Sequence, residues 1–215
     1  MTAIPLAVNG EAVSVLVVGG GRVAARKALS LIAAGADVRV IAPEITDELR
    51  SHSARHARLS ISRREYAGSS DIANAALVIA ATASREVNAR VAADAHAAHR
   101  LVNVVDAPGS GSFTTMAVHR AGDVVIGVSA GNVPSAAARI RDSIALRIDQ
   151  RYAAAVAGCS ALRSQMLTRE RASTSGSTDS GAKGEWADVN SRLIGKNFCE
   201  SVEDGTFATT LAGCR

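Results

Sequence analysis

Short apolar runs alternate with stretches of helical periodicity through the first half of the chain. The β-branched run at residues 13–18 leads into three glycines, and residues 22–34 then place their apolar side chains near one helical face. Further strands are predicted at 38–42, 59–62, 76–81 and 101–105, and helices at 46–56 and 85–98. This alternation is typical of right-handed β-α-β units and predicts an α/β fold with a Rossmann-like open parallel sheet.

The next segment has a different pattern. Residues 113–119 and 123–129 are predicted strands around an Ala-Gly turn, which indicates an antiparallel hairpin, and an amphipathic helix follows at 135–148. A hairpin with one helix is too small to bury a core by itself. We therefore expect this α+β segment to pack on the first domain or on a second copy of the chain.

The last third of the chain carries weaker signals. A Ser/Thr/Gly-rich stretch at 172–184 is typical of a disordered linker, and the residues after it show little periodicity. The sequence thus predicts three parts. These are a Rossmann domain over residues 1–112, a hairpin-plus-helix dimerisation segment over 113–150, and a C-terminal helix with a tail over 151–215. The tail is expected to be either poorly ordered or helical.

Composition narrows the class of protein. Aromatic residues make up only 3% of the chain, so the core must consist of Val, Ile, Leu and Ala. No apolar run approaches the ~18 residues that cross a bilayer, and the first residues lack the regions of a signal peptide. The three cysteines have neither a disulfide-framework nor a metal-ligand spacing. We expect a cytoplasmic protein with no membrane contact and no bound metal.

The net charge of +4 comes almost wholly from arginine. A basic surplus suits nucleic acid, an anionic membrane surface or an acidic small molecule. The arginines are scattered, and few aromatic side chains are available to stack on bases. Both features favour an acidic ligand over nucleic acid, and simple solubility is the alternative for most of these charges.

The motif Gly19-x-Gly21-x-x-Ala24 lies directly between a predicted strand and a predicted helix. In that context it matches the dinucleotide-binding fingerprint. Gly19 permits the tight turn, Gly21 lets the backbone approach a pyrophosphate, and Ala24 allows close packing of helix on strand. The free N–H groups at the helix start form an anion site. A glycine turn that binds nothing is the alternative, but strand, turn and helix together favour a nucleotide.

The end of the second predicted strand bears on the choice of cofactor. The strand stops at Pro43, and Glu44 follows near the place where a carboxylate binds the ribose of NAD. A charge that favours the start of the next helix is an equal alternative for Glu44. Because no basic residue follows directly to hold a 2′-phosphate, NAD is favoured over NADP. Thr82, near the end of the fourth strand, is a further candidate for the cofactor site, with a plain turn residue as the alternative.

Asp106 ends the fifth predicted strand, at the edge where open parallel sheets bind their ligands. A carboxylate there can act as a general base or orient a substrate N–H. By position alone, an Asp that starts a turn before a proline is the more common case. His52 and His56 have i, i+4 spacing without a third ligand nearby, so we expect them on a solvated helix face.

Several of these motifs occur together in one family. The chain resembles the precorrin-2 dehydrogenase / sirohydrochlorin ferrochelatase family, which also forms the N-terminal half of bacterial siroheme synthases. The matching stretches are VVGGGRVAARK (17–27), AGADVRVIAP (34–43), AAT (80–82), VN (87–88), NVVDAP (103–108) and SF (112–113). Gly131, Pro134 and Arg139 fit a further G-x-x-P-x-x-x-x-R stretch, and the resemblance fades beyond Arg151.

The resemblance implies NAD-dependent oxidation of precorrin-2 to sirohydrochlorin, on the way to siroheme. In some members the same cleft also inserts Fe²⁺, which is then a second substrate. It further implies a homodimer in which residues 113–150 pack between subunits. The tetrapyrrole carries many carboxylates, which suits a cleft with arginines, and the candidates are Arg85, Arg120 and Arg139.

The resemblance also assigns residues to the site. Arg22, Val23, Pro43 and Glu44 match positions that line the NAD site of the family. Asp106 matches its essential carboxylate, which serves as general base in the dehydrogenation and assists chelation. With the resemblance added, the catalytic interpretation of Asp106 is favoured over the turn.

A non-enzymatic NAD-sensing module that regulates a partner is the main alternative. Such a module would bind NAD without turnover and would use the Ser/Thr/Gly-rich stretch as its contact segment. The NVVDAP stretch followed by a hairpin favours the enzyme, because a sensor needs no carboxylate at Asp106.

Overall fold

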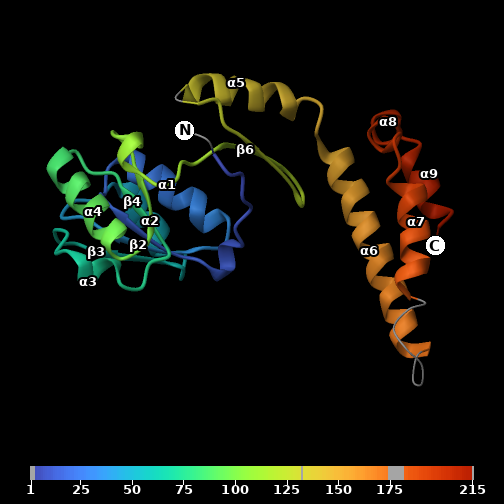
Figure 1. Cartoon of the computed structure of the whole chain (residues 1–215), viewed down its shortest axis with the longest axis horizontal. Helices are drawn as coiled ribbons and strands as arrows, with labels where there is room; N and C mark the ends of the chain where they lie inside the picture. Colours follow the sequence, from blue (N-terminus) through green and yellow to red (C-terminus); the bar gives the residue numbers. More distant parts are fainter. Residues whose placement is uncertain (1–2, 132, 174–181, 215) are drawn as a thin grey trace. The chain divides into compact units, whose positions relative to one another are not determined.

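The computed structural model describes residues 3–131, 133–173 and 182–214. The chain divides into two compact units, Met1–Thr115 and Met116–Arg215, which are described separately. None of the helices in these ranges is both long and apolar enough to cross a membrane. Figure 1 traces the elements of both units in chain order.

A five-stranded parallel sheet forms the centre of the first unit. Its strands are β1 (Ser14–Val18), β2 (Asp37–Ile41), β3 (Leu59–Ser62), β4 (Leu77–Ala80) and β5 (Leu101–Val104). Their spatial order is β3-β2-β1-β4-β5, which confirms the predicted Rossmann-like sheet. From β1 the chain adds β2 and β3 on one side of β1, and it then crosses back to place β4 and β5 on the other side. The switch point, where such sheets bind ligands, therefore lies between β1 and β4.

Helices cover both faces of this sheet. They are α1 (Arg22–Ala33), α2 (Asp47–Ser53), α3 (Ser69–Ile72) and α4 (Arg85–Ala97), with short 3-10 turns η1 (Gly10–Ala12) and η2 (Pro108–Ser110). One face packs against α1 and α2 through small or aliphatic side chains such as Ala24 and Leu49. The other face packs against α3 and α4 through Ile72 and Val91. Alanine-rich helices can approach the strands closely, which compensates for the scarcity of aromatic residues.

The segment after β5 differs from the prediction. A strand was expected from residue 113, but the N–H groups of Ser112 and Phe113 instead donate to the carbonyl of Val102 at 2.8 and 3.3 Å. The Ser112 hydroxyl accepts in turn from the N–H of Val102 at 2.8 Å. Residues 112–113 thus cover the free edge of β5, and the hairpin begins only at Ala117.

A buried carboxylate organises the connection from β3 to β4. Asp71 of α3 is only 4% exposed and accepts from both terminal nitrogens of Arg64 at 2.9 and 2.5 Å. It also accepts from the N–H of Ala67 at 2.9 Å, and Arg39 of β2 lies 3.8 Å away. The hydrogen bonds from Arg64 are the largest cause that holds the pKa of Asp71 below its usual range, and Ala67 and Arg39 add to it. The charge can be buried because its oxygens are satisfied.

The second unit combines a hairpin with five helices among its described residues. Its elements are β6 (Ala117–Ala121), β7 (Val124–Val128), α5 (Pro134–Ala145), α6 (Gln150–Ser173), α7 (Ala182–Leu193), α8 (Phe198–Asp204) and α9 (Phe207–Ala212). The strands β6 and β7 are antiparallel, as predicted, and α5 packs against both. His119 of β6 contacts the carbonyl of Ile148 at 2.6 Å and so ties the hairpin to the start of α6.

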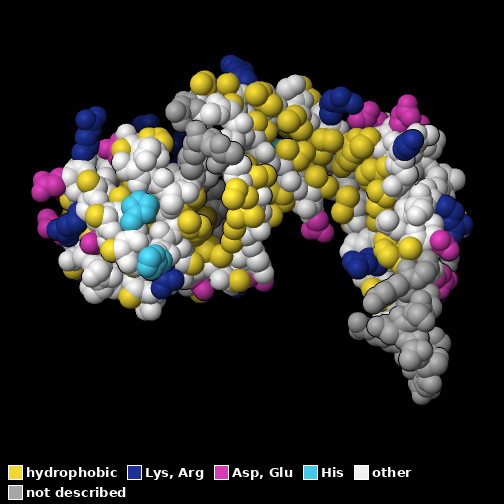
Figure 2. All heavy atoms as spheres, in the orientation of Figure 1, with side chains coloured by type: hydrophobic (Ala, Val, Ile, Leu, Met, Phe, Trp, Pro, Cys, Tyr) yellow, Lys and Arg dark blue, Asp and Glu magenta, His cyan; other side chains and the backbone are white. Residues whose placement is uncertain are grey.

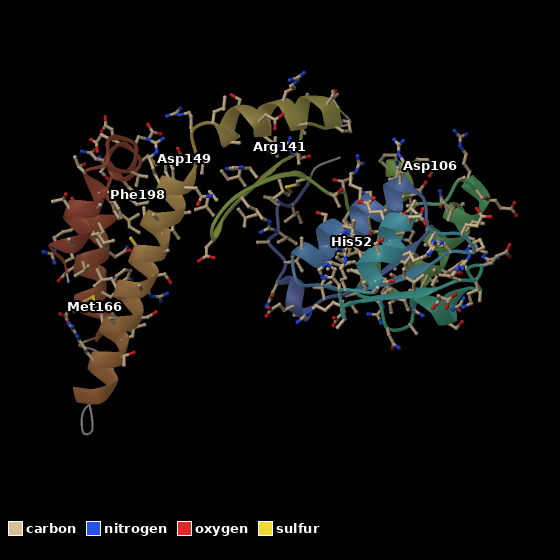
Figure 3. All side chains as sticks on the ribbon, turned by 180° about the vertical axis from the view of Figure 1, so that it is seen from behind. His52, Asp106, Arg141, Asp149, Met166 and Phe198 are labelled. Carbon is tan, nitrogen blue, oxygen red and sulfur yellow. The ribbon has the colours of Figure 1, made fainter. Side chains whose placement is uncertain are left out.

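Of the two alternatives for the tail, helical or poorly ordered, the helical one is confirmed where the structure describes it, since residues 182–212 carry α7, α8 and α9. These helices pack on α6 around Phe198, which is labelled in Figure 3. The Phe198 ring lies edge-on to the rings of Tyr152 and Phe207, with ring centroids 6.4 and 5.2 Å apart. Helices this short are not stable alone, so packing rather than their own periodicity stabilises them. Most of the predicted linker, residues 174–181, lies outside the described residues.

We predict that Asp71→Asn lowers the free energy of unfolding at neutral pH by ~2 kcal/mol, because Arg64 and Ala67 lose a charged acceptor. The pKa of Asp71 is lowered in the folded protein, so its stabilisation is present above the unfolded-state pKa and is lost as the pH falls through the folded-state pKa. Urea unfolding at several pH values should therefore show the two proteins converging in acid. The control Asp47→Asn, at an exposed pair with Arg50, should change little. A pH-independent difference would contradict the prediction.

Candidate cofactor and catalytic site

The turn after β1 lies directly against the end of β4. Gly19 has a φ of 124°, a conformation that favours glycine, and its N–H donates to the carbonyl of Ile41 at 2.9 Å. A Cβ at Gly19 would stand 2.3 Å from the carbonyl oxygen of Ala81. The predicted role of Gly19 in a tight turn is therefore supported by both conformation and space.

Gly20 packs against the backbone of the loop that follows β2. A Cβ at Gly20 would stand 2.0 Å from the carbonyl oxygen of Glu44, and the carbonyl of Gly20 accepts from the N–H of Thr46 at 3.0 Å. The fingerprint assigns no role to this middle residue, so its role was not predicted. The signal is the uninterrupted run of three glycines, one more than the fingerprint requires.

Gly21 differs from both. Its φ of −78° suits any residue, and a Cβ there would meet nothing within 4 Å. It is the N-cap of α1, where no side chain caps the helix, whereas Thr46 and Ser84 cap α2 and α4. Neither strain nor crowding requires a glycine here, and the lack of a side chain leaves open space beside the uncapped N–H groups. The turn therefore fits the pyrophosphate of a dinucleotide.

The other predicted cofactor residues surround this turn. Ala24 is fully buried and packs α1 on the sheet, as the fingerprint predicts. Arg22 and Val23 are exposed on the first turn of α1. Pro43 and Glu44 are exposed in the loop after β2, whose backbone touches Gly20. Their contacts with a cofactor stay predictions.

A hydrogen-bonded chain joins the ends of β4 and β5. Asn88 of α4 is 1% exposed, and its Oδ1 accepts from the N–H of Thr82 at 3.0 Å and lies 2.8 Å from the Thr82 hydroxyl. Its Nδ2 donates to the carbonyl of Thr82 at 3.1 Å and to Oδ1 of Asp106 at 3.0 Å. Thr82 and Asp106, predicted separately, are thus linked through one buried amide.

Asp106 lies just beyond β5 at the carboxyl end of the sheet, and its side chain is 33% exposed (Figure 3). Its Oδ2 is 3.8 Å from Nε of Arg85, whose side chain is 92% exposed, so solvent weakens this pair. Arg120 and Arg139, the other arginine candidates, are exposed on β6 and α5 of the second unit. The first unit therefore offers a carboxylate at the same end of the sheet as the glycine turn, and among the described residues nothing donates a hydrogen bond to its Oδ2.

The sequence pattern by itself predicts no role for Asn88. On α4 the buried positions are Asn88, Val91, Ala92 and Ala95, a stripe with helical spacing. A buried polar residue needs hydrogen-bond partners, so an asparagine on an apolar stripe is the signal that could have found it.

The histidines and Asn103 do not add to this site. The rings of His52 and His56 stack with centroids 5.4 Å apart on and beside α2. Across the described ranges, no group of three or more His, Cys, Asp or Glu side chains is placed to hold a metal. Asn103 donates from Nδ2 to the carbonyl of Phe113 at 3.0 Å and so fixes the segment that covers β5.

The fold and the glycine turn define a Rossmann-type dinucleotide-binding protein. Residues 6–117, slightly more than half of the chain, match the family described as "putative NAD(P)-binding". The chain belongs to this family.

The relatives agree with the resemblance seen in the sequence. The siroheme synthase of Ectopseudomonas mendocina (strain ymp) is 42% identical over 153 residues, which cover 71% of this chain and 32% of the relative. That of Pseudomonas putida (strain W619) is 34% identical over 209 residues, which cover 97% of this chain and 40% of the relative. The chain thus spans about a third to two fifths of their length. The second match covers nearly the whole chain, so this relative also aligns with residues beyond Arg151.

A solved structure shares the fold. The chain named "SirC, precorrin-2 dehydrogenase" superposes with a TM-score of 0.70 at 21% identity and covers 98% of this chain and 100% of its own. The match includes the C-terminal helices, so the fold extends over both units.

A pair of alanine substitutions tests the glycine turn. Gly21→Ala should change the free energy of unfolding by less than about 1 kcal/mol, because its Cβ meets no protein atom. It should weaken NAD binding about tenfold or more, because the Cβ fills the space meant for the pyrophosphate. Calorimetric titration with NAD and urea unfolding measure the two effects.

The matched control is Gly20→Ala, one residue away. Its Cβ meets the Glu44 carbonyl, so it should lower the free energy of unfolding by about 3 kcal/mol. Unchanged NAD affinity in a folded Gly21→Ala protein would place the pyrophosphate elsewhere.

Proposed function

We propose that this chain is an NAD-dependent dehydrogenase that oxidises precorrin-2 to sirohydrochlorin in siroheme biosynthesis. The observation that carries the proposal is the convergence of the glycine turn and Asp106 on one edge of the sheet, joined through the end of β4. The similarity to siroheme synthases and the fold shared with a precorrin-2 dehydrogenase support it.

The cofactor half of the site is the turn with its neighbours. In the proposal the pyrophosphate lies over Gly21 against the first turn of α1, beside Arg22 and Val23. The Glu44 carboxylate accepts hydrogen bonds from a ribose, next to Pro43, and Thr82 lines the site from β4. When bound, NAD supplies the hydride acceptor.

The catalytic half is Asp106. Oxidation removes a hydride and a proton from precorrin-2, and the Asp106 carboxylate takes the proton. Its Oδ1 already accepts from Asn88, so Oδ2 is the oxygen available to the substrate. Arg85 beside it is exposed and free to pair with a carboxylate of the tetrapyrrole. Insertion of Fe²⁺, as a second substrate at the same carboxylate, is a further part of the proposal.

The proposal also includes a homodimer built through residues 113–150. Within β6, β7 and α5 the buried residues are Ala121 and Ala137. Val118 and Val125 are exposed on one face of the hairpin, and Ile140 is exposed on α5. Hydrophobic side chains gather over β6 and α5 in Figure 2. An apolar surface on a segment that buries so little of itself is typical of an interface between subunits.

We also infer a reducing compartment, such as the cytoplasm. All three cysteines are free, and Cys159 is buried among the C-terminal helices. Free thiols are typical of proteins that function where disulfides do not persist.

The central test is precorrin-2 with NAD, followed by absorbance of sirohydrochlorin and NADH and repeated with Fe²⁺ for siroheme. We predict that Asp106→Asn lowers kcat by ~10²–10⁴-fold, because the base is lost, and leaves NAD affinity within about twofold. Glu86→Gln, an exposed carboxylate on the first turn of α4, is the control and should keep its kcat. An Asp106→Asn protein with undiminished kcat would remove the assigned base.

The dimer has its own test. Val118→Asp combined with Val125→Asp should shift the protein to monomer in sedimentation velocity, because two charges would be desolvated at the interface. Ile194→Asp, at an exposed apolar residue after α7, should leave the mass unchanged. A wild-type protein that already sediments as a monomer would refute the dimer.

A further inference from the structure

The Asn88 side chain has only one orientation available to it. Both Nδ2 protons are used, one on the carbonyl of Thr82 and one on Oδ1 of Asp106. Its Oδ1 receives the N–H of Thr82 and lies beside the Thr82 hydroxyl. A flipped amide would set Oδ1 against two acceptors and Nδ2 against an N–H donor, which costs the two bonds to Thr82 backbone atoms and the bond to Asp106. Burial to 1% keeps water from replacing them.

The anchors of Asn88 are independent of Asp106. Thr82 follows β4 by two residues, and Asn88 lies in the first turns of α4, whose start is capped by Ser84 through the N–H of Val87 at 3.2 Å. Asp106, by contrast, lies on a bend beyond β5 with a partly exposed side chain. Over the described ranges, the hydrogen bond from Asn88 is the one that holds its carboxylate. Asn88 is therefore the fixed partner, and Asp106 is the one whose orientation depends on the bond.

We propose that Asn88 is a positioning residue for Asp106, which rests on the proposed function. By occupying Oδ1, Asn88 fixes the rotation of the carboxylate and presents Oδ2 to the substrate proton. The two oxygens then have different roles, one structural and one in proton transfer. Arg85, the charged group beside Oδ2, is too exposed to fix the carboxylate in place of Asn88.

Loss of the amide should affect turnover rather than binding. Without the Nδ2 donor the carboxylate rotates freely, and a misplacement of about 1 Å costs on the order of 10²-fold in rate. We expect Asn88→Leu to lower kcat, measured at saturating NAD, by ~10–10²-fold, with KM for precorrin-2 within about threefold. Ser84→Ala is the matched control, since it removes the α4 cap and destabilises the same helix without touching Asp106. It should keep its kcat.

A double-mutant cycle separates positioning from a merely structural role. With Asp106→Asn already present there is no base to orient, so adding Asn88→Leu should not lower the residual kcat further. If Asn88→Leu lowers kcat by the same factor in both backgrounds, or if Ser84→Ala lowers it equally, Asn88 acts through stability alone and the proposal is wrong.

A measurement without turnover tests the bond itself. In NMR spectra of the full chain, Asp106→Asn should shift one of the two Nδ2 proton resonances of Asn88 and leave the one bound to Thr82 in place. If neither Nδ2 proton resonance of Asn88 moves, the positioning role of Asn88 is wrong and the proposed function still stands. A wild-type chain that does not oxidise precorrin-2 with NAD would instead overturn the proposed function, and the catalytic part of this inference with it.

Discussion

Two close backbone contacts at the end of β1 determine the geometry of the site. The carbonyl of Ala81 lies where a Cβ on Gly19 would stand, and the carbonyl of Glu44 lies where one on Gly20 would stand. Only residues without side chains allow this approach. The contacts bring the ends of β4 and β2 against the end of β1 and leave Gly21 open at the start of α1. The cofactor half of the site thus depends on backbone packing, in which the side chains have little part.

The proposed catalytic half of the site depends on a buried polar side chain. Asn88 uses its whole hydrogen-bonding capacity to join the end of β4 to the carboxylate beyond β5. Asp71 does the same in the crossover between β3 and β4, where it joins Arg64 to the start of α3. In both places a polar side chain is buried where two elements meet. Because all its hydrogen bonds are made, the network favours one arrangement of those elements. Together they hold the loops around a sheet whose core is otherwise aliphatic.

The two units bury their apolar surface in different ways. The first unit has a hydrophobic core on each face of its sheet, and helices of the same unit cover both cores. In the second, the α6–α9 helices share a core around Phe198, whereas the hairpin and α5 keep Val118, Val125 and Ile140 exposed. This difference agrees with a self-contained nucleotide-binding domain and with the proposed dimer interface on the hairpin and α5.

Local pattern was enough to predict the parallel sheet, α1, α4 and the glycine turn, because strand and helix periodicity and the fingerprint lie within short stretches of chain. The position of Asp106 after β5 followed from the same pattern. The role of Gly20, the anchoring of Asp106 by Asn88 and the packing of α7 to α9 were decided by the tertiary structure. Each depends on atoms that are distant in sequence, such as the Glu44 carbonyl or the α6 surface, and no local periodicity reports which of them will meet.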